Sequence, residues 1–121
     1  WVINKVKLAI ADFLQANPTK TTKDVTVACY GLAFKPDIDD LRESPALNIT
    51  KQIAEFHSGK VIAVEPNINK LPNSVSSFYL STFENAEENA DIHLLLVDHK
   101  EFKLTKNSSR YLIDLKGIWS C

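Results

Sequence analysis

Short apolar runs alternate along this 121-residue chain with segments of helical period, and this alternation is what most constrains the fold. The apolar or β-prone runs occupy 25–30, 61–64, 78–80, 92–97 and 111–114. No short hairpin turn joins two of these runs, and a crossover between parallel strands needs about a dozen residues or more. We therefore predict a five-stranded, mainly parallel sheet with its strands in the order 3-2-1-4-5, the run at 78–80 forming a short edge strand.

A helical pattern precedes the first strand. Asn17-Pro18 ends it, and its apolar face consists of Val2, Ile3, Val6, Ile10, Phe13 and Leu14. We interpret this face as core packing, with a dimer or interdomain surface as the alternative. The whole pattern predicts an α/β fold: a Rossmann-like three-layer sandwich preceded by an N-terminal helix.

Capping residues mark the later helices. Ser44-Pro45 supplies an N-cap and a first-turn proline for a helix over 46–56, which we expect Gly59 to close as its C′ residue. Thr82 is expected to cap a helix through Ala90. Asp98, with Glu101 three residues later, resembles a capping box and predicts a brief helix.

The run from Gly31 to Pro45 places two cations in a loop between the first strand and this capped helix. The loop leaves the carboxyl end of a strand, where open α/β sheets bind ligands. We expect Lys35 and Arg42 to contact phosphate, the lysine as a mobile charge and the arginine as a planar fork. The alternatives are a solvated Lys35, and an Arg42 paired with acids of its own loop.

The same turn lacks the glycines of a dinucleotide-binding loop. Gly-x-Gly-x-x-Gly allows backbone to approach a pyrophosphate, whereas here only Gly31 is present and bulky residues follow it. We therefore expect no dinucleotide to bind through this fingerprint. Glu65 follows the second strand, where an acid would hold a ribose; without the glycines we interpret it as a turn residue before Pro66.

Other reactive side chains have structural interpretations. His99 is either an acid–base group or, as we favour, a first-turn helix residue beside the Asp98 cap. Cys29 is interpreted as a small buried hydrophobe. The spacing of Cys29 and Cys121 matches no metal-ligand motif, so no metal site is expected.

Composition excludes some partners. The formal net charge of −1 provides no electrostatic footprint for nucleic acid or an anionic membrane. There is no signal peptide, and the apolar runs are far shorter than the ~20 residues that span a bilayer. We expect a cytoplasmic protein. The chain has no methionine and begins at Trp1 inside a helical pattern, which suggests a fragment of a larger protein.

Five segments together resemble one family: Gly-Leu-Ala-Phe-Lys-Pro (31–36), Asp-Asp-Leu-Arg-Glu-Ser-Pro-Ala (39–46), Val-Glu-Pro-Asn (64–67), Leu-Val-Asp-His (96–99) and Asp-Leu-Lys-Gly-Ile-Trp (114–119). They are similar to the C-terminal, UDP-sugar-binding domain of the UDP-glucose/GDP-mannose dehydrogenase family, over about residues 25 to 119. The Ile-Asp-Asp-Leu-Arg-Glu-Ser-Pro and Val-Asp-His forms most resemble members that act on UDP-N-acetyl-D-mannosamine.

The resemblance implies that residues 1–20 end an interdomain linker helix and that 21–121 form the UDP-sugar-binding domain. It adds Lys116 as a phosphate or uridine contact, a surface lysine being the alternative, and implies that Phe34, Asp40 and Ser44 support the loop. The implied parent is an NAD-dependent dehydrogenase, expected to be a homodimer. NAD would be bound mainly by a domain absent here, and the catalytic cysteine would lie upstream, so the isolated domain is expected to be inactive.

The parent is expected to oxidise UDP-N-acetyl-D-mannosamine to the corresponding uronate for surface polysaccharide synthesis. UDP-N-acetylglucosamine and UDP-glucose are alternative substrates. A non-catalytic oligomerisation module is a second kind of function. A signalling receiver-like module shares the predicted strand order, but it needs an acidic pair just after the first strand, where this chain has Gly31-Leu32.

Overall fold

The computed structural model describes residues 2–32, 44–66, 68, 71, 77–97, 99–103 and 111–114. In chain order its elements are α1 (Val2–Ala16), the 3-10 helix η1 (Thr22–Asp24), β1 (Val27–Tyr30), α2 (Pro45–Phe56), β2 (Val61–Val64), β3 (Tyr79–Ser81), α3 (Phe83–Asn89), β4 (Ile92–Leu95), α4 (Lys100–Lys103) and β5 (Leu112–Asp114). The predicted helices and strands are confirmed with shifts of one to three residues at some ends.

The five strands form one sheet in the order β3-β2-β1-β4-β5, and every neighbouring pair is parallel. The predicted order and the edge position of β3 are therefore confirmed. In the register of the central strands, Val27 lies opposite Val61 on one side and Ile92 on the other. The chain builds the sheet outward from β1 to β3 and then crosses back to place β4 against β1, so the order reverses beside β1.

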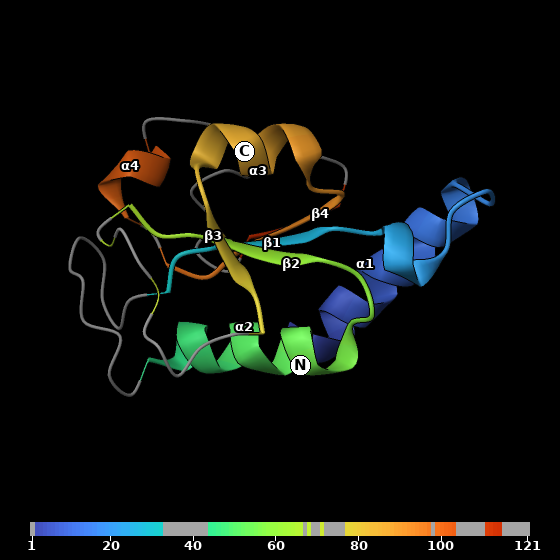
Figure 1. The fold of residues 1–121 in the computed structure, drawn as a ribbon, viewed down its shortest axis with the longest axis horizontal. Coiled ribbons are helices and arrows are strands. Elements are labelled where there is room, and N and C mark those ends of the chain that lie inside the picture. The colour runs from blue at the N-terminus through green and yellow to red at the C-terminus, as the bar shows by residue number, and fades with distance from the viewer. Residues whose placement is uncertain are drawn as a thin grey trace.

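Helices cover both faces of the sheet, with α1 and α2 on one and α3 and α4 on the other (Figure 1). Side chains alternate along each strand: Val27 and Cys29 join the core under α1 and α2, whereas Ala28 and Tyr30 join the core under α3. The interpretation of the first helix as core packing is confirmed, because its buried residues Val6, Ile10 and Phe13 all belong to the first of these cores.

The predicted N-caps are confirmed for two helices. The Ser44 side chain accepts a hydrogen bond from Leu47 N–H at 3.2 Å, and Thr82 Oγ1 accepts one from Asn85 N–H at 3.1 Å. Asp98, the predicted cap of α4, lies outside the described residues. Because α4 begins at Lys100, the residue directly before it is His99.

The prediction that Gly59 closes α2 as a C′ residue is wrong. The C-cap is His57, whose backbone is extended at φ −87° and ψ 126° and whose N–H donates to Ile53 O at 2.9 Å. Glycine is needed two residues later for space, since a Cβ at position 59 would lie 2.3 Å from the carbonyl oxygen of Val25. The crossover into β2 passes too close to the chain before β1 for any side chain.

Within the described residues, no helix combines the length and the apolar character needed to cross a membrane.

Candidate functional site

The carboxyl ends of the parallel strands meet at one edge of the sheet, on the left in Figure 1. At the end of β1 the chain turns through Gly31, which has a φ of 100° and donates its N–H to Val64 O at 2.8 Å. A Cβ on Gly31 would lie 2.5 Å from Val97 Cβ, so the end of β1 packs directly against the chain that leaves β4. Only glycine meets both requirements at this position.

A buried acid and a buried histidine face each other across this edge. Glu65 follows β2 with 3% of its surface exposed, and His99 precedes α4 fully buried. Glu65 Oε1 accepts the N–H of Leu32 at 2.8 Å and lies 2.8 Å from His99 Nε2. The two atoms share a hydrogen bond, in which His99 Nε2–H is the donor when Glu65 is ionised. One oxygen at the end of β2 therefore binds the segments that follow β1 and β4.

These contacts correct two interpretations. Glu65 does begin a turn, as Ile68 N–H lies 3.4 Å from its carbonyl oxygen, but treating it as a turn residue alone was wrong because its carboxylate ties two segments together. His99 is likewise not a first-turn helix residue. Both follow strands predicted to flank β1, so their proximity was implicit in the predicted strand order, although neither residue type by itself indicated a pair.

Of the predicted loop and phosphate contacts, the described residues include one, Ser44. It is 2% exposed and donates its hydroxyl to Leu32 O while capping α2. Leu32 and Ser44, the last described residue before the loop and the first after it, are therefore bonded to each other. The other predicted contacts, Phe34, Lys35, Asp40, Arg42 and Lys116, lie outside the described residues.

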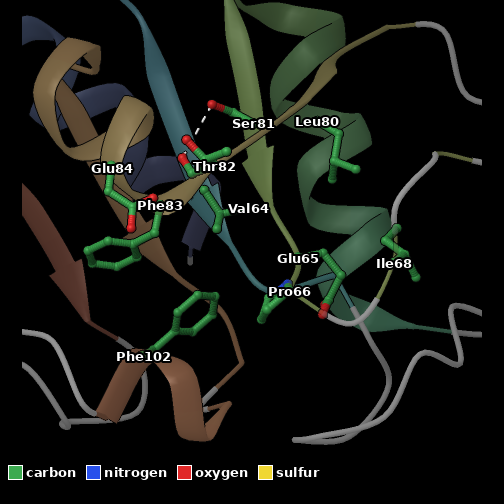
Figure 2. Close-up of a pocket in the computed structure, with 10 residues that line it drawn as sticks. All are labelled: Val64, Glu65, Pro66, Ile68, Leu80, Ser81, Thr82, Phe83, Glu84 and Phe102. Atoms are coloured by element: carbon green, nitrogen blue, oxygen red, sulfur yellow. Dashed lines mark hydrogen bonds between the residues drawn. The ribbon is translucent and has the colours of Figure 1, made fainter.

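A pocket of about 560 Å³ opens beside Glu65 (Figure 2). Its lining residues come from the end of β2 and the turn after it, from β3, from the start of α3, and from α4. They are Val64, Glu65, Pro66, Ile68, Leu80, Ser81, Thr82, Phe83, Glu84 and Phe102. Phe83 and Phe102 form one wall, with ring centroids 6.1 Å apart. No lysine or arginine is among these described residues. Its described lining is largely apolar, which suits an uncharged or apolar group.

The first described residue after Gly31 uses its backbone N–H internally. In a dinucleotide-binding loop the backbone N–H groups of this turn point at the pyrophosphate, whereas here the Leu32 N–H is bound by Glu65 at 2.8 Å. Glu65, which stands where an acid would hold a ribose, makes this contact through its Oε1. In the described part of this turn, the Leu32 N–H is therefore used within the domain.

Two other reactive side chains, Cys29 and His93, are buried away from solvent. Cys29 is fully buried, as predicted, and burial raises the pKa of its thiol to about 12. Burial also lowers the pKa of His93, against the opposing effects of the Ala90 backbone and Asp91, and its Nδ1 lies 2.7 Å from the Tyr30 hydroxyl. Cys29 belongs to the core under α1 and α2. Across the described part of the chain, no three His, Cys, Asp or Glu residues gather as a metal site.

The model of the UDP-glucose/GDP-mannose dehydrogenase family, UDP binding domain, matches residues 28–120. The chain is 46% identical over 123 aligned positions to the UDP-N-acetyl-D-mannosamine dehydrogenase of Yersinia pestis, covering 98% of this chain and 29% of that protein. It is 41% identical to the NDP-N-acetyl-D-galactosaminuronic acid dehydrogenase of Ralstonia solanacearum, covering 99% of this chain and 27% of the relative.

Among solved structures, the UDP-N-acetyl-mannosamine dehydrogenase of Staphylococcus aureus has a similar fold, with a TM-score of 0.67 at 24% identity. The match covers 100% of this chain and 27% of that one. The chain therefore spans less than a third of the length of the curated relatives it matches.

Proposed function

We propose, since the chain belongs to the UDP-glucose/GDP-mannose dehydrogenase family, that it is the UDP-sugar-binding domain of an NAD-dependent UDP-sugar 6-dehydrogenase. The preferred substrate of the parent enzyme is UDP-N-acetyl-D-mannosamine, oxidised in the cytoplasm to the uronate used in surface polysaccharides. The observation that carries the proposal is the high identity, along nearly the whole chain, to relatives named for this substrate.

In this proposal the domain binds and orients the substrate. When bound to the parent, NAD would supply the hydride acceptor for the oxidation at C6 of the sugar, with one NAD for each of the two hydrides. The occupied turn after β1 and the inert Cys29 support assigning NAD and the nucleophilic cysteine to other parts of the parent. Residues 1–20 would end the helix that links this domain to them, and the parent would act as a homodimer. Lys35, Arg42 and Lys116 would hold phosphate, aligning C6 for reaction.

The proposal is tested first by Lys35→Ala in the full-length enzyme, numbered as in this chain. A hydrogen bond to a charged group contributes about 1.5–3 kcal/mol, so the KM for UDP-sugar should rise about tenfold or more. Loop substitutions usually change stability by no more than about 0.5 kcal/mol, so the melting temperature should barely move. Steady-state kinetics with each ligand varied, together with thermal unfolding, measure both effects.

Lys23→Ala is the matched control, because Lys23 is an exposed lysine in η1, before the amino end of β1. It should leave both Michaelis constants unchanged. Unchanged constants for Lys35→Ala as well would make Lys35 a solvated loop charge and contradict the proposal. A rise confined to the KM for NAD would instead assign the loop to the cofactor side of the cleft.

Arg42→Lys tests the planar fork separately from the charge. Lysine keeps the positive charge but loses bidentate geometry, and we expect a loss of about 2 kcal/mol, at least tenfold in kcat/KM. Substrate-dependent rates of the full-length variant measure the loss, with UDP-N-acetyl-D-mannosamine, UDP-N-acetylglucosamine and UDP-glucose compared. A kinetically normal variant would identify Arg42 as an ion-pair partner of the neighbouring acids.

A further inference from the structure

The pocket beside Glu65 lies where the two faces of the sheet meet. Its walls belong to different cores, because Ile68 and Leu80 pack against the core under α1 and α2, whereas Phe83 packs against the core under α3. Figure 2 shows Val64, the last residue of β2, between these two walls. The pocket is thus a crevice outside the carboxyl ends of β2 and β3, at the edge where open parallel sheets bind ligands.

One wall of the pocket is a fixed aromatic surface. The rings of Phe83 and Phe102 lie 6.1 Å apart between centroids, with 33° between their planes. Both also contact the ring of Tyr30, at 5.5 Å and 5.9 Å, and Tyr30 is fully buried. The wall is therefore formed before any ligand arrives. Aromatic rings attract further rings at centroid separations of about 4.5–7 Å, so this wall favours a flat ring.

Most polar side chains of the described lining already make hydrogen bonds inside the domain. Glu65 Oε1 takes part in two of them, at 2.8 Å each. Thr82 Oγ1 accepts the Asn85 N–H at 3.1 Å, and Ser81 Oγ accepts the Asn85 side-chain amide at 2.7 Å. A ligand therefore finds few polar partners among these groups. Burial of its apolar surface is its main source of affinity.

Two carboxyl groups set the charge of the described lining. Glu84 is exposed in the first turn of α3, and Glu65, which adds a negative charge when it is ionised, is buried after β2. Figure 2 shows Glu84 beside Phe83 and Glu65 on the opposite side of the pocket. Since like charges repel, these two residues disfavour a ligand that carries a carboxylate or a phosphate here. An uncharged ring meets no such penalty.

We propose that this pocket binds an uncharged, flat aromatic ring compound, seated on Phe83 and Phe102 and covered by Leu80 and Ile68. The volume of about 560 Å³ agrees with this class of ligand, since small-molecule sites measure roughly 300–1,000 Å³. The inference uses none of the residues to which the proposed function assigns phosphate, so it stands or falls separately from that function.

Indole is the probe, because it is uncharged, flat and small enough for the pocket. Its binding to the full-length enzyme is measured by ligand-observed NMR titration, with saturating UDP and NAD present to fill the sites of the proposed reaction. We expect a Kd of about 1 mM, as for a well-placed ring compound of this size. Binding that disappears when UDP and NAD are added would place indole in the substrate or cofactor site and overturn the inference, as would no binding at all.

Two variants in the same enzyme locate the probe. Phe83→Ala should weaken indole binding about tenfold, because it removes half of the aromatic wall. Leu80→Trp should weaken it at least as much without removing packing, because the new ring itself occupies the pocket. Unchanged indole binding in Leu80→Trp would place the probe elsewhere and overturn the inference, even if Phe83→Ala does not fold.

Phe56→Ala is the matched control. Phe56 is 36% exposed on α2, which covers the other face of the sheet, and Lys7 Nζ lies 5.1 Å from its ring centroid. Its removal should leave the Kd for indole within about twofold of wild type. A loss as large as that of Phe83→Ala would show that indole binds exposed aromatic surface in general, which contradicts a specific site.

Ligand charge provides an independent test. Indole-3-acetate carries the same ring with a carboxylate, and it should bind at least about threefold more weakly than indole. Glu84→Gln removes one of the two carboxylates and should reduce this difference while leaving the Kd for indole itself unchanged. If indole-3-acetate binds more tightly than indole, the pocket prefers anions and the inference is wrong.

Discussion

Gly31→Ala is expected to destabilise the domain by about 3 kcal/mol, enough to unfold a large share of the molecules in a marginally stable domain. Two effects combine. The φ of 100° is disfavoured for any residue with a Cβ, and the added methyl would lie 2.5 Å from Val97 Cβ and 2.9 Å from Val97 N. Urea unfolding of the chain, followed by circular dichroism, measures the loss as a fall in the midpoint.

Gly31→Asn separates the two effects. Asparagine tolerates positive φ better than alanine but carries the same Cβ, so both variants should be strongly destabilised if contact with Val97 dominates. If Gly31→Asn loses markedly less unfolding free energy than Gly31→Ala, the positive φ is the main cause of the destabilisation. A Gly31→Ala variant within about 0.5 kcal/mol of wild type would contradict the close packing of β1 against the segment after β4.

Alkaline pH is expected to destabilise the domain through Cys29. Burial raises the pKa of its thiol from 9.0 to about 12, so the unfolded chain releases this proton at a lower pH than the folded one does. The stability that the buried, protonated thiol contributes is fully present below pH 9 and is lost as the pH rises toward 12. The free energy of unfolding should fall by about 1.4 kcal/mol per pH unit above pH 9, a total of about 4 kcal/mol if the fold persists.

Cys29→Ala provides the comparison, since lysines and tyrosines titrate equally in both proteins. The difference between the two curves of unfolding free energy against pH isolates the thiol, and parallel curves would contradict the burial of Cys29. In a Cys121→Ser background, the folded chain at pH 8 should also react with a thiol reagent about 10³-fold more slowly than the unfolded chain, since about three pKa units separate their thiolate fractions.

An unreactive Cys29 bears on function. A cysteine that captures an aldehyde must reach its thiolate form near neutral pH, in contact with substrate. Cys29 meets neither condition, because it is 0% exposed within the core beneath α1 and α2 and its pKa is raised. Cys29 is therefore not suited to the role of the nucleophilic cysteine in the proposed reaction.

Sequence alone determined the architecture, because the signals for it are local. Apolar runs such as Val61–Val64 matched their strand to the residue, and Ser44 and Thr82 capped the helices they were predicted to cap. Because no hairpin-length turn joins two strands, the sequence predicts a parallel sheet, which the structure has. The lengths of the connections between strands limit the possible strand orders. Each of these features depends on residues that are near one another in the chain.

Only the tertiary structure shows the hydrogen bonds and close contacts between segments that are far apart in the chain. Glu65 and His99 are 34 positions apart, and Glu65 and Leu32 are 33 apart, so their shared oxygen arises only once β2, β1 and β4 lie side by side. Gly59 was assigned to a helix end from its residue type, but its actual constraint is the carbonyl of Val25, 34 positions earlier. Period and capping report on a single turn or strand, whereas a buried polar contact and a close backbone approach depend on the packing of the whole sheet.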